Sequence, residues 1–218
     1  MNVIELRNYL LKPGARDKFI EYFKDHFLES QNVLGADTPE QFRIKGEDDR
    51  FFWIRGFSNM KERGKFLRAF YDGQVWKEFG PAANYMMLEW HNVHLLKPVS
   101  VNTIEFDKKQ KLLVIDYYTT VNNQRDQLID LFTQNYLPVY NKSGINNISL
   151  WVSEMAVNDF PGLPVYQQEN LLVVITGYNS EVEYKSVTDR SDAIKKKIDS
   201  NINELVETRN SLILYPAY

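Results

Sequence analysis

The stretch IELRNYLLKPGARDKFIEYF, residues 4–23, decides the fold because it recurs as LVIDYYTTVNNQRDQLIDLF at residues 113–132. Each copy is a strand-like run, a turn, and an Arg-Asp pair that opens a segment with the apolar periodicity of a helix. Two further blocks repeat in the same order: WIRGFSN (53–59) with VITGYNS (174–180), and VHLLKP (93–98) with SLILYP (211–216). Three collinear matches predict an internal duplication.

Each half is predicted to form a β-α-β-β-α-β unit, which is the ferredoxin-like order. Phe19, Phe23 and Phe27 follow one another at intervals of four and mark one face of a helix. Ser58 is predicted to cap the next helix. The expected elements of the first half are strand 3–10, helix 15–31, strands 41–46 and 50–57, a helix after Ser58 with a second piece after Gly73, and strand 86–96.

The second half is predicted to repeat this order. Its expected elements are strand 111–120, helix 124–140, strands 147–155 and 171–178, helix 189–204 and strand 208–215. We therefore predict two domains, residues 1–98 and residues 111–218, joined by a linker at 99–110. The loop VNDFPGLPVYQQEN (157–170) is long and carries two prolines, so we expect it to act as a lid or a contact arm.

The run FFWIRGF (51–57) is apolar on both of its alternating faces. A sheet with one face in water would alternate apolar with polar residues, so this strand is predicted to be covered on both sides. Helices would cover one side and the second repeat the other. The predicted fold class is α+β: two tandem ferredoxin-like repeats whose antiparallel sheets pack face to face as an α/β barrel.

The polar residues of these strands are assigned to the barrel interior, and the face with Ile4, Leu6 and Leu10 is assigned to the helices. A buried guanidinium at Arg55 needs a carboxylate, because an unpaired buried charge costs several kcal/mol. We expect Glu5 or Glu89 to supply it. The residues expected to meet in the interior are Glu5, Arg7, Tyr9, Trp53, Arg55, Glu89 and His91.

Composition indicates a folded protein with a real core, since 44% of residues are hydrophobic and 14% aromatic. The net charge of -3, with both signs mixed, does not indicate a nucleic-acid surface or a membrane-binding patch. The chain has no cysteine, which excludes disulfides and thiolate metal sites. No signal-like or membrane-spanning run is present, so we expect a cytoplasmic location.

Four motifs carry a family resemblance: ELRNYLLKPG (5–14), WIRGF (53–57), AFYDGQVWKE (69–78) and LLKP (95–98). They resemble the motifs of the NIPSNAP family. This resemblance implies the dimeric α/β-barrel superfamily fold and brings no established catalytic set. Wider relatives on that fold include cofactor-free monooxygenases, small-ring isomerases and haem-binding enzymes. The second half resembles a diverged copy, in which Asp116 replaces Arg7 and Thr176 replaces Arg55.

The arginines and carboxylates allow two interpretations. Arg55 and Arg7, with Glu5 and Glu89, could bind or polarise an anionic or carbonyl group. The same residues could form a structural ion-pair network that sets the strand register. Trp53 would line the pocket in the first case, and Tyr71 would donate a hydrogen bond at its rim.

His91 also has two interpretations: a general base held by Glu89, or a hydrogen-bonded histidine without a catalytic role. His91 or Tyr9 would move a proton in an enzyme. A haem ligand at His91 is a minor option. Three scattered histidines show no metal-ligand spacing, so neither a metal nor a cofactor is expected.

Two classes of function stay open. The first is a protein that binds a small apolar or aromatic molecule in the barrel, as a binding protein or as a cofactor-independent monooxygenase- or isomerase-like enzyme. The second is a non-catalytic interaction or structural protein whose barrel interior is filled by its own side chains. Exposed strand edges also leave homo-oligomerisation open.

Overall fold

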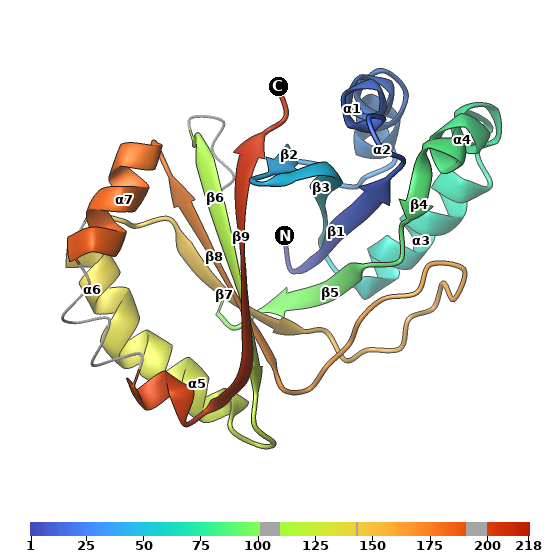
Figure 1. Cartoon of the computed structure of the whole chain (residues 1–218). Helices are drawn as coiled ribbons and strands as arrows, with labels where there is room; N and C mark the ends of the chain where they lie inside the picture. Colours follow the sequence, from blue (N-terminus) through green and yellow to red (C-terminus); the bar gives the residue numbers. More distant parts are fainter. Residues whose placement is uncertain (101–109, 143, 191–199) are drawn as a thin grey trace. The chain divides into compact units, whose positions relative to one another are not determined.

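The computed structural model describes residues 1–100, 110–142, 144–190 and 200–218 (Figure 1). These residues divide into two compact units. Unit 1 is Met1–Lys97 with Glu154–Gln167 and Pro216–Tyr218, and unit 2 is Pro98–Ser153 with Gln168–Tyr215. Most of the expected linker 99–110 and of the expected helix 189–204 lies outside the described residues. The domain boundaries therefore stay a prediction.

The sheet of unit 1 is antiparallel and is centred on β1 (Val3–Leu11). Along its length β1 pairs with β3 (Glu47–Phe57), and β3 pairs in turn with β2 (Gln41–Ile44). On its other side β1 meets β4 (Met87–Glu89) and β5 (Val93–Pro98). The single strand expected at 86–96 is thus two short strands, with residues 90–92 between them.

Helices cover one face of this sheet (Figure 1). The first helical stretch runs through α1 (Arg16–Phe23), a π-helical segment (Lys24–Leu28) and α2 (Glu29–Val33). The second comprises α3 (Met60–Tyr71) and α4 (Gln74–Met86). Asn59, and not Ser58, caps α3, because its side chain accepts the backbone N–H of Glu62 at 3.0 Å.

The segment Glu154–Gln167 belongs to unit 1 although it follows β7 (Ile148–Ser153) of unit 2 in the chain. Its backbone pairs with β5: Tyr166 N–H donates to Val93 O at 2.7 Å, and Leu95 N–H donates to Tyr166 O at 3.3 Å. Leu163 is buried in the same apolar cluster as the helices α1 and α3. We call this segment the strap. The strap includes most of the loop 157–170, which was expected to be a lid or contact arm.

Unit 2 repeats the pattern around β6 (Leu112–Thr120), which pairs antiparallel with β8 (Leu171–Tyr178) and β9 (Val206–Pro216). β7 (Ile148–Ser153) pairs with β8. The chain from β6 to β7 passes through α5 (Arg125–Leu131), a π-helical segment (Phe132–Tyr136) and α6 (Leu137–Lys142), and α7 (Glu181–Arg190) follows β8 (Figure 1). Thus both units combine antiparallel strands with helices, and the expected α+β class is confirmed.

The duplication is also visible in the strand register. Glu5 pairs with Arg55 across β1 and β3. The matching residues of the second half, Val114 and Thr176, pair across β6 and β8. The two halves therefore share the sequence blocks and also the way in which their central strands pair.

The face assignment made from the sequence is wrong. Val3, Tyr9 and Trp53 lie in one cluster with the helical residues Phe19 and Phe66, so the face that also carries Glu5, Arg7 and Arg55 is the helix-covered face. Ile4 and Leu6 lie on the opposite face and are buried as well. Because both faces are buried and largely apolar, the alternation of residues carries no information about which face meets the helices.

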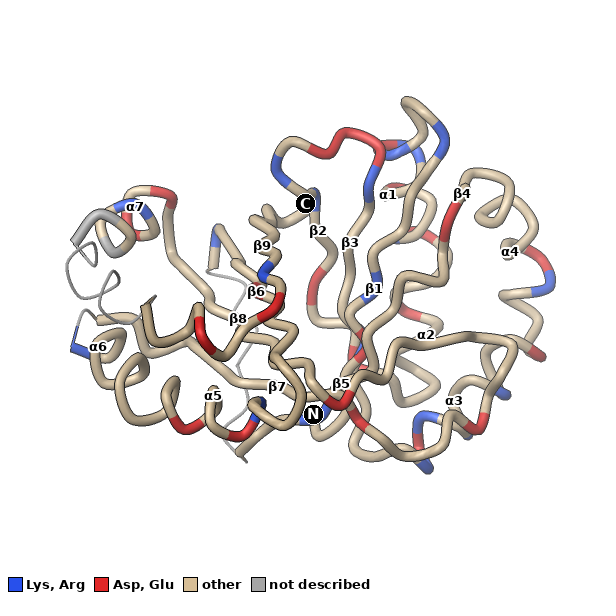
Figure 2. Tube along the Cα trace, turned by 60° about the horizontal axis from the view of Figure 1, so that its bottom comes forward, with Lys and Arg blue, Asp and Glu red and all other residues tan. Residues whose placement is uncertain are grey.

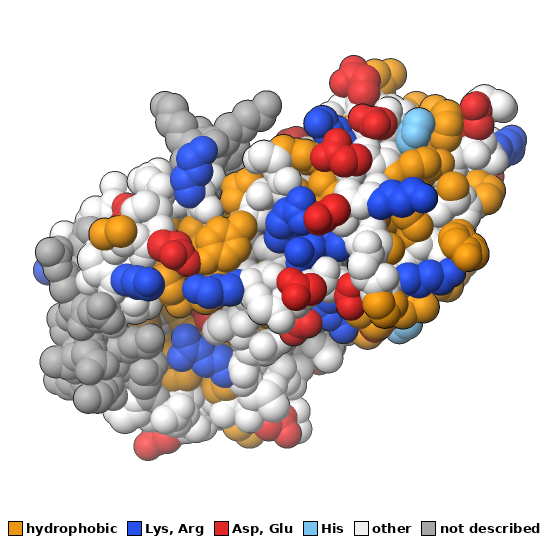
Figure 3. All heavy atoms as spheres, turned by 45° about the horizontal axis from the view of Figure 1, so that its top comes forward, with side chains coloured by type: hydrophobic (Ala, Val, Ile, Leu, Met, Phe, Trp, Pro, Cys, Tyr) orange, Lys and Arg blue, Asp and Glu red, His pale blue; other side chains and the backbone are white. Residues whose placement is uncertain are grey.

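Charged residues of both signs are spread over both units. The turn between β2 and β3 and the first residues of β3, positions 45–50, carry basic and acidic residues side by side (Figure 2). Acidic and basic side chains are likewise interspersed on the face shown in Figure 3. Among the residues that the structure describes, no helix is long and apolar enough to cross a membrane.

Candidate functional site

Alternate residues of two paired strands place the candidate site under the helices of unit 1. Glu5 stands opposite Arg55, and Arg7 stands opposite Trp53. Tyr9 follows two residues later on β1, on the same face. The antiparallel register therefore gathers five of the expected site residues within a few ångströms of one another.

The centre of the site is a single carboxylate that accepts hydrogen bonds from three arginines. Arg7 Nη1 and Arg55 Nε each donate to Glu5 Oε2 at 2.8 Å, and Arg63 Nε donates to Glu5 Oε1 at 2.8 Å. The side chains of all four residues are at most 1% exposed. We call these four residues the arginine cluster.

Burial alone would raise the pKa of the Glu5 carboxyl group. The charges of Arg55, Arg7 and Arg63 outweigh burial and hold that pKa well below its ordinary value of 4.5. Glu5 is therefore ionised at neutral pH and serves the three arginines as a shared counter-ion. It is not a proton acceptor.

This pKa shift makes stability depend on pH. A carboxyl group whose pKa is lowered by folding stabilises the folded state above its unfolded pKa, and this contribution is lost as the pH falls towards the folded pKa. We expect the free energy of unfolding to fall as the pH drops below about 4.5. In a carbon-13 NMR titration, the Glu5 carboxyl signal should stay unchanged to about pH 3, while exposed glutamates titrate near their usual pKa. A Glu5 signal that titrates with the exposed glutamates would contradict this assignment.

Aromatic rings surround the guanidinium groups. The guanidinium carbon of Arg7 lies 5.3 Å from the Trp53 ring centroid. The guanidinium carbon of Arg55 lies 5.2 Å from the ring centroid of the same tryptophan. Arg55 also lies 5.1 Å from the ring of Phe66. Such cation–π contacts stabilise a desolvated cation without neutralising it.

Tyr9 connects the arginine cluster to the cavity. Arg7 Nε donates to the Tyr9 hydroxyl oxygen at 2.8 Å, so the Tyr9 O–H bond is directed elsewhere. Burial raises the pKa of Tyr9, although the charge of Arg7 opposes that change. Tyr9 is therefore a neutral hydrogen-bond donor at neutral pH.

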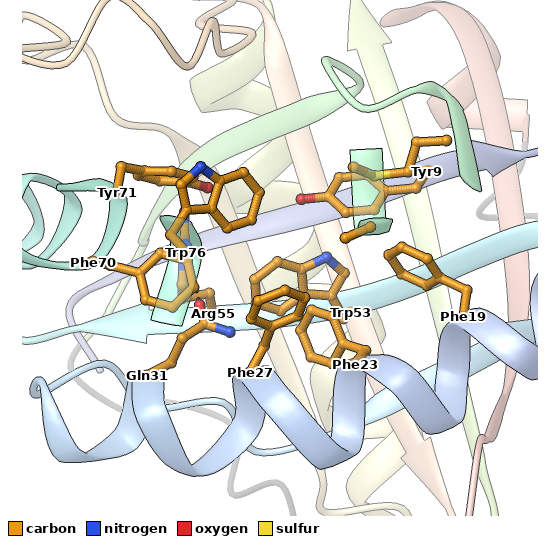
Figure 4. A pocket seen from close by; sticks show the side chains of 12 residues that line it. Tyr9, Phe19, Phe23, Phe27, Gln31, Trp53, Arg55, Phe70, Tyr71 and Trp76 are labelled. Atoms are coloured by element: carbon orange, nitrogen blue, oxygen red, sulfur yellow. Dashed lines mark hydrogen bonds between the residues drawn. The ribbon is translucent and has the colours of Figure 1, made fainter. Parts of the chain in front are cut away.

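A cavity lies beside the arginine cluster, between the sheet and the helices of unit 1 (Figure 4). Tyr9 and Tyr71 enter it from opposite sides, with their hydroxyl groups directed towards each other. Its cavity volume is about 30 Å³, and all the empty space at this place, open solvent included, amounts to about 330 Å³. The lining residues are mainly aromatic: Tyr9, Phe19, Phe23, Phe27, Gln31, Trp53, Arg55, Phe70, Tyr71, Trp76, Ala83 and Met87.

Two lining residues carry buried donors that lack an acceptor in the described part of the chain. Trp53 Nε1 is buried without a hydrogen-bond partner, and so is Arg55 Nη2. Arg55 Nη2 approaches Glu5 Oε2 to 2.6 Å, but its N–H bonds do not point at that oxygen. Arg55 Nη1 donates to Gln31 Oε1 at 3.1 Å. Buried donors are nearly always paired, so two orphan donors on residues that line one cavity are unusual.

The structure does not bring Glu89 and His91 into this site. Glu89 Oε2 lies 3.8 Å from Arg50 Nη2, and its Oε1 lies 3.5 Å from His91 Nε2. The His91 side chain is 53% exposed. Neither residue lines the cavity. Among the described residues, no group of three or more potential metal ligands occurs.

Arg63 and Gln31 were not predicted from the sequence, although both occupy positions on apolar helix stripes. Arg63 precedes Phe66 and Phe70 by three and seven residues, and Gln31 follows Phe27 by four. A polar residue in register with a buried stripe is a signal of a buried polar contact. That signal was available in the sequence.

The strap completes the arginine cluster. Asn158 Oδ1 accepts from Arg63 Nη1 at 3.0 Å, and Asp159 Oδ1 lies 4.0 Å from the same nitrogen. Phe160 stacks on Tyr71 at a centroid distance of 5.6 Å. Residues from the second half of the chain therefore hold two side chains of the site in the first half.

Replacing Asn158 with Ala should lower the free energy of unfolding by about 1–3 kcal/mol, because Arg63 Nη1 would lose its acceptor in a buried place. Urea denaturation measures this change. Asn122→Ala, at an exposed turn of unit 2, is the control and should change the free energy by less than about 0.5 kcal/mol. Equal effects of the two substitutions would show that the strap does not support Arg63.

The geometry defines an α+β protein of the ferredoxin-like kind with an aromatic cavity and a buried arginine cluster in its first unit. The NIPSNAP family model matches residues 4–102, so the resemblance expected from the motifs is confirmed for the first half of the chain. No match was found among curated proteins.

Solved structures similar to the whole chain exist at low sequence identity. A putative monooxygenase from Lactobacillus acidophilus is 11% identical with a TM-score of 0.69, and 100% of this chain and 95% of that chain are covered. A putative monooxygenase from Fusobacterium nucleatum is 8% identical with a TM-score of 0.71, covering 99% and 92%. An anthrone oxidase-like protein is 12% identical with a TM-score of 0.65, covering 100% and 92%. At these identities the likeness concerns the fold alone.

Proposed function

We propose that this protein binds a small aromatic molecule, which carries an oxygen acceptor, in the cavity of unit 1. The observation that carries this proposal is the pair of orphan buried donors, Trp53 Nε1 and Arg55 Nη2, on an otherwise aromatic wall. Tyr9 adds a third donor, because its oxygen already accepts from Arg7. The aromatic lining stabilises a flat apolar body, and the three donors hold its oxygen.

The donors also suit an enzyme of the cofactor-independent monooxygenase or isomerase kind. Hydrogen-bond donors in a dry site stabilise negative charge that develops on a substrate oxygen. Tyr9 is the group that could transfer a proton, whereas the exposed position of His91 gives no support for such a role. The names of the structural neighbours, putative monooxygenases and an anthrone oxidase-like protein, agree with this candidate activity.

A second candidate, a non-catalytic protein with a packed interior, is favoured by one observation. The enclosed volume of about 30 Å³ is smaller than an aromatic ring needs. A ligand must therefore occupy the mouth as well, where Tyr71 and Trp76 are only partly buried. The two candidate functions differ in whether Tyr71 and Trp76 leave room for the aromatic ring of a ligand.

The Trp53 indole N–H reports directly on binding in nitrogen-15 NMR spectra, and Trp53→Phe identifies its signal among the 4 tryptophans. Acetophenone, which has a carbonyl oxygen on one ring, should shift this signal downfield by forming a hydrogen bond. Ethylbenzene, the matched probe without an acceptor, should not form that bond. If neither probe moves the signal at saturating concentration, the packed alternative holds and the proposal fails.

A further inference from the structure

The buried charges of the site do not balance. Arg7, Arg55 and Arg63 contribute three positive charges, and Glu5 contributes one negative charge. Among the described residues, Asp159, which is 42% exposed and lies 4.0 Å from Arg63, is the remaining acid in contact with the cluster. One positive charge is left without a counter-ion even when Asp159 is counted in full. An uncompensated buried charge is unfavourable, so a bound anion would relieve it.

The uncompensated charge lies next to the cavity. Arg63 has both Glu5 and Asp159 nearby, and Arg7 is bonded to Glu5 and to the Tyr9 hydroxyl oxygen. Arg55 shares Glu5 with the other two arginines, and its second partner, Gln31, is neutral. Arg55 is also the arginine that lines the cavity. Of the three arginines, Arg55 thus brings the excess charge closest to the cavity.

Glu5 shows what this environment does to an acid. Its carboxyl group is completely buried, and yet the guanidinium charges keep its pKa below the ordinary value. In this cluster the attraction of the arginines outweighs the cost of removing a carboxylate from water. An acidic hydroxyl group placed beside Arg55 meets the same guanidinium charges, opposed in part by the carboxylate of Glu5.

We propose that the ligand oxygen held by Arg55, Trp53 and Tyr9 is a single negatively charged oxygen, the phenolate or enolate form of an aromatic hydroxyl compound. This inference rests on the proposed function, since it concerns the charge of the ligand in the same cavity. One negative charge matches the one unbalanced positive charge. The site has donors for this oxygen and, among the described lining residues, no carboxylate or imidazole that would repel or protonate it.

4-Nitrophenol tests the charge state directly, because its phenolate absorbs at a longer wavelength than the neutral phenol. When 4-nitrophenol is bound to the protein, it should show the phenolate spectrum even at a pH about one unit below the pKa of the free compound. This result corresponds to a pKa that binding lowers by about 1–3 units. Arg55→Met should abolish the shift. Arg43→Met removes the same charge from β2, outside the cavity, and should leave the shift unchanged.

4-Nitroanisole separates this inference from the proposed function, since it has the same ring and cannot ionise. We expect it to bind at least tenfold more weakly than 4-nitrophenol. If 4-nitrophenol binds as the neutral phenol, or both compounds bind equally, the charge inference is overturned and the proposed function stands. If neither compound perturbs the Trp53 indole signal, and neither displaces the other from the protein, the proposed function fails together with the inference.

Discussion

Glu5→Gln is expected to lower the free energy of unfolding by about 3–5 kcal/mol, because removing one partner of a buried ion pair leaves the others uncompensated. Here the loss of one carboxylate leaves three buried guanidinium groups, and the acid that remains nearby among the described residues is the partly exposed Asp159, 4.0 Å from Arg63. Glutamine keeps the shape of the side chain and removes its charge. Urea denaturation of the whole chain measures the change.

Glu89→Gln is the matched control for this substitution. Glu89 was expected from the sequence to share the role of Glu5, but it lies near the partly exposed Arg50 at 3.8 Å. Such a pair contributes less than about 1 kcal/mol. If the two substitutions destabilise equally, the arginine cluster does not depend on Glu5. Should Glu5→Gln not accumulate as folded protein, Glu5→Asp, which keeps the charge, should restore folding in part.

The double variant Glu5→Gln with Arg55→Met gives a further check. Removing one guanidinium together with the carboxylate lowers the number of uncompensated charges. The double variant should therefore be less destabilised than the sum of the two single variants, by about 1–3 kcal/mol of coupling. Strict additivity would show that Glu5 and Arg55 do not interact energetically in the folded protein.

Arg55→Met is expected to weaken the binding of an oxygen-bearing aromatic probe by about 100-fold. A hydrogen bond from a charged donor contributes about 1.5–3 kcal/mol, and a tenfold change in affinity corresponds to 1.4 kcal/mol. Methionine keeps most of the apolar volume in a place surrounded by Trp53, Phe57 and Phe66. Titration of the 4-nitrophenol spectrum measures the affinity.

Stability should respond little to Arg55→Met, although binding weakens. The substitution removes a cation from a cluster that has one too many, so the free energy of unfolding should change by less than about 1 kcal/mol. This separates a ligand-binding arginine from a structural one. A loss of stability as large as that of Glu5→Gln, with binding unchanged, would assign Arg55 to the ion-pair network alone.

The two predictions show why the arginine cluster has a dual character. Glu5 joins three elements, because Arg7, Arg55 and Arg63 come from β1, β3 and α3. Its removal therefore affects the fold. Arg55 joins Glu5 to the cavity, and its removal affects what the cavity can hold.

The sequence by itself determined the duplication, the order of the elements and the motifs of the NIPSNAP domain, because these depend on local patterns that repeat along the chain. It also brought Glu5, Arg7 and Arg55 together as one cluster, since strand alternation places them on one face. The resemblance and the fold class are confirmed. The site residues as a set, including Trp53 and Tyr71, remain a proposal.

Only the tertiary structure decided which face of the sheet the helices cover, because both faces are apolar and alternation has no preferred direction. It also supplied Arg63, Gln31 and Asn158, which come from two helices and from the strap, far from β1 in the sequence. Glu89 is separated from the site because it pairs with Leu10, on the face opposite to Tyr9, and His91 lies in the break between β4 and β5 at residues 90–92. Charge balance in a buried site is a property of groups that meet in space, and so it became visible only when all of them were in place.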